Sequence, residues 1–283
     1  VMMRTLTLSF LIICTSLSLP TRAAELALEG IEGAQPLNVI FILSDDHRYD
    51  VMSFLGHPWV ETPAMDAMAK EGVYFRNAMV TTSLCSPSRA SILTGQYMHN
   101  HGVVDNNVLT PKGTVFFPQY LQAAGYQTGY FGKWHMGGHS DAPRPGFDKW
   151  VSFRGQGHYY PPKGRKWSLN IDGKSVPQKG YITDELTDYA VDWLRSRKRD
   201  KPFFLYLPHT MPHWPQYSSE RFAGKSANGK WGDAAEEIDW STGEILKALK
   251  ANSIDEKTMV IFMSDNGGPL RHGASNKPLK GGK

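Results

Sequence analysis

The sequence predicts an α/β fold, in which a mainly parallel sheet is sandwiched between helices. Two short apolar runs carry this prediction, one at residues 38–43 (Asn-Val-Ile-Phe-Ile-Leu) and one at 259–263 (Met-Val-Ile-Phe-Met). Continuous apolar runs that are rich in β-branched residues are typical of strands buried on both faces, as in parallel sheets. Segments with helical features separate the predicted strands, and this alternation favours parallel strands joined by helices.

Both apolar runs are followed by the same kind of polar sequence. Residues 44–47 read Ser-Asp-Asp-His, and residues 264–266 read Ser-Asp-Asn. If the two strands are parallel, their carboxyl ends open onto one edge of the sheet, where open α/β sheets place their ligands. Two solvated turns would leave the same pattern, but hard oxygen donors gathered at one edge suit Ca²⁺ or Mg²⁺ better than zinc. The candidate metal ligands are Asp45, Asp46, Asp265 and Asn266.

The elements between the two runs follow from capping residues and periodicity. A helix is predicted to begin at Thr62-Pro63 and to end at Gly72, with a cap, a first-turn proline and a terminal glycine in the expected places. Apolar residues at helical spacing predict two amphipathic helices later in the chain, at 183–197 and 234–249. The other predicted elements are an extended segment at 73–80, helices at 88–94 and 117–124, and strands at 127–131 and 203–207.

Length, charge and the N-terminal residues limit the class of protein. The 283 residues are enough for one large domain. Arg4, the apolar run 6–19 and the segment Thr21-Arg22-Ala23 predict a signal peptide at 1–24 and a mature domain at 25–283, with an uncleaved anchor as the alternative. Removing Arg4 and Arg22 lowers Lys and Arg from 31 to 29 against 27 acidic residues, so the formal charge falls from +4 to +2. We therefore expect an exported protein, periplasmic or secreted, with no nucleic-acid partner and no membrane attachment after cleavage.

The chain has two cysteines, Cys14 within the predicted signal peptide and Cys85 in the mature domain. A lone cysteine cannot form an internal disulfide, and a free thiol is unusual in an exported protein. One interpretation is a small buried filler residue. However, Pro87 suits the first turn of a helix, which would place Cys85 at a helix N-terminus, where free N–H groups favour an anion. Arg89, one turn later, could point back to the same place.

The segment Cys85-Ser86-Pro87-Ser88-Arg89, followed by Ala-Ser-Ile-Leu-Thr-Gly, resembles the signature of the type I sulfatases. The chain is similar to bacterial polysaccharide sulfatases, including N-acetylglucosamine-6-sulfatase-like enzymes. The resemblance implies an alkaline phosphatase-like fold and the hydrolysis of sulfate esters, on sulfated carbohydrates. It also implies that a maturation enzyme oxidises Cys85 to formylglycine, whose hydrate is the nucleophile, and that this residue joins the predicted ligands around one Ca²⁺ ion.

The same resemblance implies roles for residues in other motifs. The segment Gly132-Lys133-Trp134-His135 matches a family pattern in which Lys133 holds a sulfate oxygen and His135 acts as a base. His213, in Met-Pro-His-Trp-Pro, matches the histidine near the leaving group and is the candidate general acid, in preference to nearby His209. Arg89 would orient the formylglycine, and Lys283 would hold a second sulfate oxygen. Other residues expected near the substrate are His47, Arg48, Asp50 and either Gln156 or His158.

Residues 137–179 form an insert that is rich in Gly, Pro, Tyr, Trp and basic residues. Alternation at 167–176 around Asp172-Gly173 predicts a β-hairpin. The aromatic and basic side chains of the insert could stack on sugars and pair with sulfates, or they could attach a surface hairpin to the body of the protein. These side chains are Tyr159, Tyr160, Arg165, Lys166 and Trp167.

The resemblance also sets expectations about the extent of the domain. Relatives continue beyond the Gly-Gly-Lys motif at 281–283 into more of the main sheet and a smaller C-terminal domain, so we expect the catalytic domain at 25–283 to be incomplete. Two other functions stay open: a phosphonate or phosphate ester hydrolase of the same superfamily, and a non-catalytic relative that binds sulfated glycans. A simple cysteine hydrolase is disfavoured, because an unmodified thiol is a poor partner for a hard ion.

Overall fold

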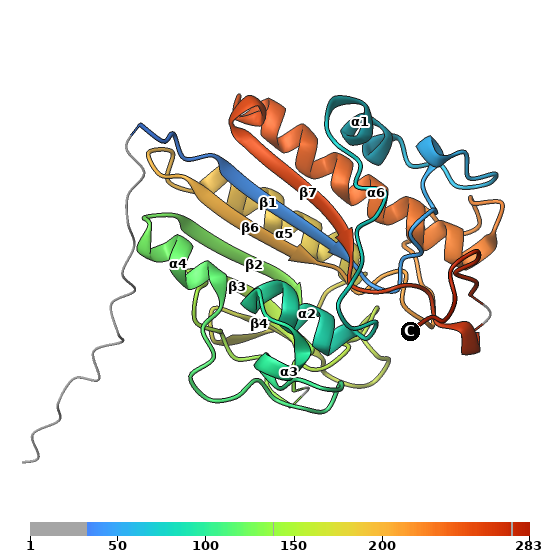
Figure 1. Cartoon of the computed structure of the whole chain (residues 1–283), viewed down its shortest axis with the longest axis horizontal. Helices are drawn as coiled ribbons and strands as arrows, with labels where there is room; N and C mark the ends of the chain where they lie inside the picture. The colour runs from blue at the N-terminus through green and yellow to red at the C-terminus, as the bar shows by residue number, and fades with distance from the viewer. Residues whose placement is uncertain (1–32, 138, 273) are drawn as a thin grey trace, which may run out of the picture.

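The computed structural model describes residues 33–137, 139–272 and 274–283, so the predicted signal peptide at 1–24, with Cys14, lies outside the described residues. Within them, one seven-stranded sheet has the strand order β5-β4-β3-β2-β6-β1-β7 (Figure 1). The strands β3, β2, β6, β1 and β7 run parallel, and the hairpin of β4 and β5 continues the sheet in antiparallel fashion. The bounds are β1 (Asn38–Ser44), β2 (Gln127–Lys133), β3 (Lys149–Phe153), β4 (Ser168–Ile171), β5 (Lys174–Pro177), β6 (Phe203–Pro208) and β7 (Thr258–Ser264).

Helices cover both faces of the sheet, which confirms the predicted fold class. Helices α5 and α6 lie on one face, α2, α3 and α4 lie on the other, and α1 packs beside α6 (Figure 1). Their bounds are α1 (Pro63–Glu71), α2 (Cys85–Thr94), α3 (Met98–His101), α4 (Phe117–Ala123), α5 (Ile182–Ser196) and α6 (Gly229–Ala251), with short 3₁₀ turns at Ser53–Leu55, Asp255–Lys257 and Leu270–His272. In the described part of the chain, none of the helices is both long and apolar enough to cross a membrane.

The surroundings of strand β1 explain why its sequence is apolar at successive positions. Ile40 and Ile42 point into the core beneath α5 and α6, whereas Leu43 belongs to the core beneath α2 and α4. Successive side chains of a strand point to opposite faces, and both faces are covered here, so polar alternation is absent. Burial on two sides fixes the strand and therefore the position of the polar residues at its carboxyl end.

The predicted strands all form and are slightly longer than expected, and the hairpin in the insert forms as β4 and β5. Helix α3 was not predicted, α6 begins at Gly229 rather than at 234, and two further features differ from the predictions. The segment 73–80 pairs with no strand among the described residues, and Phe75 and Met79 are 74% and 82% exposed. Strand β3 was not predicted, because its five residues lie within the Gly- and Pro-rich insert and become a strand by pairing with β2.

Gly132, in β2, approaches the neighbouring strand too closely for any other residue. Its φ of 149° falls in the region that favours glycine, and an added Cβ would overlap the carbonyl oxygen of Pro208 at the end of β6. The next residue is Lys133, so this close approach also fixes where that side chain enters the interior.

We expect Gly132→Ala to lower the free energy of unfolding by about 2 kcal/mol or more, because backbone strain and a steric overlap coincide. The measurement is urea-induced unfolding followed by circular dichroism. Gly180→Ala is the matched control, since a Cβ there would meet nothing within 4 Å. Equal stability of the two variants would contradict this account of Gly132.

Candidate active site

The carboxyl ends of β1 and β7 bring four of the predicted ligands together. The two strands pair in parallel with Ser44 opposite Ser264, so the acidic residues that follow them lie side by side. The backbone N–H of Asp46 donates to Asp265 Oδ1 at 3.2 Å, and Asn266 Nδ2 donates to Asp46 Oδ1 at 2.6 Å. All four residues, Asp45, Asp46, Asp265 and Asn266, are buried. The alternative interpretation, in which these residues form two solvated turns, is therefore wrong.

Cys85 is the first residue of α2 and faces the same cluster. Its Sγ lies 3.5 Å from Asp45 Oδ1, and the side chain is fully buried. Burial, reinforced by the nearby Asp45 carboxylate, raises the pKa of the thiol to about 12. A thiol in these surroundings keeps its proton, so it lacks the thiolate character of a reactive cysteine.

The cluster has the composition of a site for a hard cation. Asp45, Asp46, Cys85 and His213 each offer one donor atom, and these atoms all lie within 4.8 Å of one another. Asn266 Oδ1 is buried and has no hydrogen-bond partner among the described residues, so a carbonyl oxygen is available as a further ligand. Carboxylate and amide oxygens suit Ca²⁺, whereas the sulfur of an unmodified Cys85 does not. The residues present therefore fit such an ion best when residue 85 also offers oxygen.

Arg89 forms hydrogen bonds with buried groups of this cluster. From α2 its guanidinium donates to Asp265 Oδ2 through Nε at 3.0 Å and Nη2 at 2.8 Å, and to the carbonyl oxygen of Lys133 at 2.8 Å. Asp45 Oδ2 lies 3.4 Å from the same Nη2. Arg89 thus faces two buried carboxylates, Asp265 at hydrogen-bond distance and Asp45 slightly further away.

Two lysines pair with different carboxylates of the cluster. Lys133 Nζ, at the end of β2, lies 2.5 Å from Asp45 Oδ2 and 2.5 Å from Gln156 Oε1. Lys283 Nζ lies 2.9 Å from Asp46 Oδ1 and 3.0 Å from its Oδ2. Although burial by itself would raise it, the pKa of Asp45 is held well below its usual value by Lys133 and its other cationic neighbours. Each ammonium group is thus paired with a carboxylate of the cluster.

His135 and His213 lie on loops that follow neighbouring strands. Burial and the nearby ammonium group of Lys133 lower the pKa of His135 to about 2, so the ring is neutral. Its backbone is left-handed, with φ at 59°, and Asp46 shares this uncommon conformation with φ at 61°. The ring of His213 lies between Asp46, with Nε2 3.7 Å from Oδ2, and Tyr159, whose hydroxyl is 3.3 Å from Nδ1. Burial lowers the pKa of His213 as well.

The structure separates the alternatives that the sequence left open. His209 is buried and shares a hydrogen bond with Ser241 of α6, whereas His213 reaches the carboxylate cluster. Gln156 contacts Lys133, whereas the ring of His158 packs against Trp167 at 4.1 Å.

Other candidates contact residues outside this cluster. The Nε2 of His47 lies 2.9 Å from the carbonyl oxygen of Val51, within hydrogen-bond distance, and Arg48 pairs with Asp50. Tyr160 donates to the carbonyl oxygen of Ser218 at 2.8 Å, which favours the attaching role for this aromatic residue.

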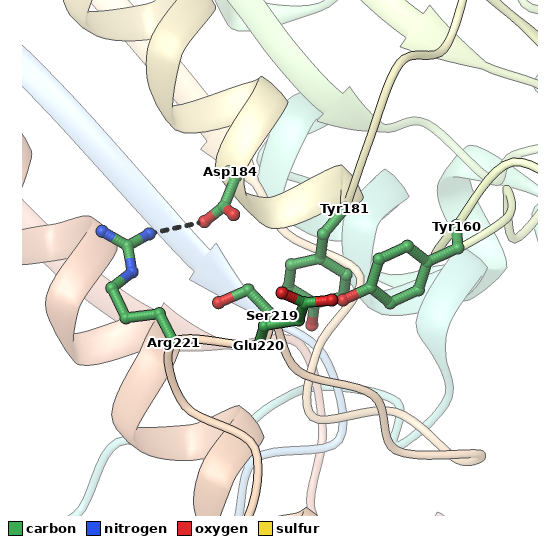
Figure 2. Close-up of a pocket in the computed structure, with 6 residues that line it drawn as sticks. All are labelled: Tyr160, Tyr181, Asp184, Ser219, Glu220 and Arg221. Carbon is green, nitrogen blue, oxygen red and sulfur yellow. Dashed lines mark hydrogen bonds and ion pairs between the residues drawn. The ribbon is translucent and has the colours of Figure 1, made fainter.

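A hollow lined in part by Tyr160 of the insert contains none of the predicted catalytic or metal-binding residues (Figure 2). Its volume is about 320 Å³, and an ion pair of 2.8 Å between Arg221 and Asp184 spans one side. Behind it lies Glu237 of α6, which accepts the backbone N–H of Ser219 at 2.9 Å, while its Oε1 has no hydrogen-bond partner among the described residues. Burial raises the pKa of Glu237 to about 7.

The raised pKa of Glu237 should make the stability of the protein depend on pH. In the unfolded chain Glu237 loses its proton near the ordinary pKa of 4.5, whereas in the folded protein it keeps the proton up to a pH of about 7. The contribution of Glu237 to the free energy of unfolding is therefore most favourable below pH 4.5. It is lost as the pH rises to about 7. We expect Glu237→Gln, which cannot ionise, to stabilise the protein by roughly 1–2 kcal/mol more at pH 8 than at pH 5. Urea unfolding at both pH values measures this. Glu220→Gln, at an exposed position of the same hollow, is the control, and an equal pH dependence in both variants would contradict the assignment.

Comparison with known proteins identifies the family. The sequence model of the family described as Sulfatase matches residues 37–283. The chain is 35% identical to human N-acetylgalactosamine-6-sulfatase over 90% of its own length and 55% of that protein, and 37% identical to the N-acetylglucosamine-6-O-sulfatase of Bacteroides thetaiotaomicron over 87% and 43%. A solved structure of Ps i-CgsB in complex with k-i-k-neocarrahexaose superimposes with a TM-score of 0.79 at 34% identity, covering 88% of this chain and 62% of that one. The chain thus spans about half the length of the curated relatives it matches, and it belongs to the sulfatase family.

Proposed function

We propose that this chain carries the catalytic site of an exported, Ca²⁺-dependent sulfatase that hydrolyses sulfate esters of carbohydrates, with Cys85 oxidised to formylglycine. The observation that carries the proposal is the cluster of buried Asp45, Asp46 and Cys85 with half-buried His213, whose donor atoms lie within 4.8 Å of one another. Lys133 and Lys283 flank it as the cationic groups that a sulfate monoester needs.

The ion would be held by oxygen donors of the cluster. These are Asp45, Asp46, Asp265 and Asn266, together with residue 85 in its oxidised form. When bound, Ca²⁺ supplies positive charge beside the sulfate group, and the hydrate of formylglycine supplies an oxygen nucleophile. His213 is left free for the leaving group, because a hard cation prefers oxygen to the nitrogen of a histidine.

The other side chains would bind and orient the substrate or move protons. Lys133 and Lys283 would hold sulfate oxygens, and Arg89 would keep Asp265 and residue 85 in place. His135, whose ring is neutral, has a nitrogen lone pair and would accept a proton from residue 85. His213 would donate through Nε2 to the leaving-group oxygen as that oxygen gains negative charge.

The proposed substrate class is supported by the activities of relatives. The Bacteroides relative is an N-acetylglucosamine-6-O-sulfatase, and the Ps i-CgsB structure is a complex with k-i-k-neocarrahexaose. The predicted signal peptide supports export, and oxidation of Cys85 requires a maturation enzyme as a partner.

The test begins with the protein produced in its source organism. Mass spectrometry of the tryptic peptide 77–89 should show a species lighter by the difference between a thiol and an aldehyde. The same preparation should hydrolyse 4-nitrophenyl sulfate much faster than 4-nitrophenyl phosphate or an aryl phosphonate. Preferred hydrolysis of the phosphorus esters would assign the chain to the alternative hydrolase class. An unmodified thiol, together with binding but no turnover of sulfated glycans, would indicate the non-catalytic alternative.

A further inference from the structure

A chain of polar contacts joins Lys133 to the far side of the His213 ring. Lys133 Nζ is 2.5 Å from Gln156 Oε1, Gln156 Nε2 is 3.4 Å from the Tyr159 hydroxyl, and that hydroxyl is 3.3 Å from His213 Nδ1. The four residues come from β2, the insert and the loop after β6, so only the tertiary fold connects them.

The chemistry of the groups fixes the direction of the first two hydrogen bonds in this chain. An ammonium group can only donate, so the amide oxygen of Gln156 faces Lys133 and its NH₂ group faces Tyr159. An amide NH₂ can only donate as well, so the tyrosine oxygen accepts from it. The hydroxyl proton of Tyr159 is then free, and among the described residues His213 Nδ1 is the acceptor within its reach.

The consequence concerns the tautomer of His213. A neutral imidazole that accepts at Nδ1 carries its proton on Nε2. Nε2 is the nitrogen that faces the carboxylate cluster, 3.7 Å from Asp46 Oδ2, whereas Nδ1 faces the insert. The opposite tautomer would present a lone pair to the reacting group and would repel an oxygen that is gaining negative charge.

We propose that Tyr159 is a positioning residue that keeps the proton of His213 on Nε2, aimed at the leaving-group oxygen. This inference rests on the proposed sulfatase activity and extends it to a residue outside the sulfatase motifs in the sequence. Tyr159 acts through His213. Lys133 orients the amide of Gln156, which in turn donates to the Tyr159 hydroxyl. The ring of Tyr159 also stacks on Tyr217, with centroids 5.2 Å apart, so the hydroxyl is held in place by packing.

The test uses Tyr159→Phe, which keeps the stacked ring and removes only the hydroxyl. Rates are measured for 4-nitrophenyl, phenyl and 4-methoxyphenyl sulfate, whose leaving groups become progressively more basic. Donation to the leaving oxygen matters more when that oxygen is more basic. We expect kcat to fall about 10-fold or more for 4-methoxyphenyl sulfate and only about 2-fold for 4-nitrophenyl sulfate, with KM changed less than about 2-fold.

Tyr160→Phe is the matched control, because the hydroxyl of Tyr160 binds the carbonyl oxygen of Ser218 and the same substitution there should leave the leaving-group dependence unchanged. In a His213→Ala background, Tyr159→Phe should have no further effect on any member of the series. An equal loss across the series, no loss at all, or full additivity with His213→Ala would overturn the inference. Absence of hydrolysis of all three sulfates by the formylglycine-containing wild-type protein would instead refute the proposed function, and this inference with it.

Discussion

Cys85→Ala is expected to abolish sulfate-ester hydrolysis while leaving the fold intact. If residue 85 supplies the nucleophile, its loss removes the reacting group itself, and kcat/KM for 4-nitrophenyl sulfate should fall by about 10⁴-fold or more. The side chain is small, and Asp45 is its hydrogen-bond partner, so the free energy of unfolding should change little. Steady-state kinetics and urea unfolding on the same preparation measure the two quantities.

Two controls separate chemistry from structure in this experiment. Wild-type protein made without the maturation enzyme should keep the thiol at residue 85 and should be as inactive as Cys85→Ala, since burial leaves that thiol protonated. Calorimetric titration with Ca²⁺ should show weaker binding by both forms than by the oxidised protein, because a ligand oxygen is missing. Retention of a tenth of the wild-type rate by Cys85→Ala would show that another group is the nucleophile.

Arg89→Met should cause the largest loss of stability, about 3–5 kcal/mol, because it leaves buried carboxylates without their partner. Arg89 forms two hydrogen bonds with Asp265 Oδ2 and lies 3.4 Å from Asp45, and its own side chain is buried. Methionine fills a similar volume, so the loss reports on the missing charge and hydrogen bonds rather than on a cavity. Urea unfolding measures the free energy.

A double-mutant cycle tests the cause of this loss. Asp265→Asn removes the charge that Arg89 neutralises, so Arg89→Met with Asp265→Asn should be clearly more stable than Arg89→Met alone. Lys149→Met is the control, since its ion pair with Asp172 is partly exposed and should contribute less than about 1 kcal/mol. A double variant no more stable than Arg89→Met would locate the stabilising role of Arg89 elsewhere, at Asp45 or at the carbonyl oxygen of Lys133.

The cluster of acidic residues proposed to bind the metal could be predicted because it depends on local sequence. The apolar runs at 38–43 and 259–263 identify buried strands, and the polar residues directly after them must lie at the strand ends. Parallel pairing is the only further assumption, and the helical segments between the strands favour it. The position of Cys85 at the start of a helix could also be predicted, because the helix start and the family signature occupy the same residues.

The contacts of Arg89, Gln156 and Tyr159 could not be predicted in the same way. Arg89 was expected to face the N-terminus of its own helix, but the fold brings Asp265, 176 residues away, to its guanidinium group. Tyr159 lies in an insert with little secondary-structure signal, and its partner His213 is 54 residues further on. Such contacts depend on how loops are placed by packing, which neither periodicity nor a local motif encodes.

The central position of β1 has a consequence for the order of events during synthesis. This strand is made early, but its two neighbours, β6 and β7, begin at Phe203 and Thr258. Until they emerge, the apolar strand has no hydrogen-bonding partner on either edge, and the helices that cover one of its faces are also incomplete. Closing loops of this length slows folding and leaves apolar surface open to association with other chains. The nascent chain should therefore depend on holding chaperones, and refolding from denaturant should be slow and should succeed best at low protein concentration.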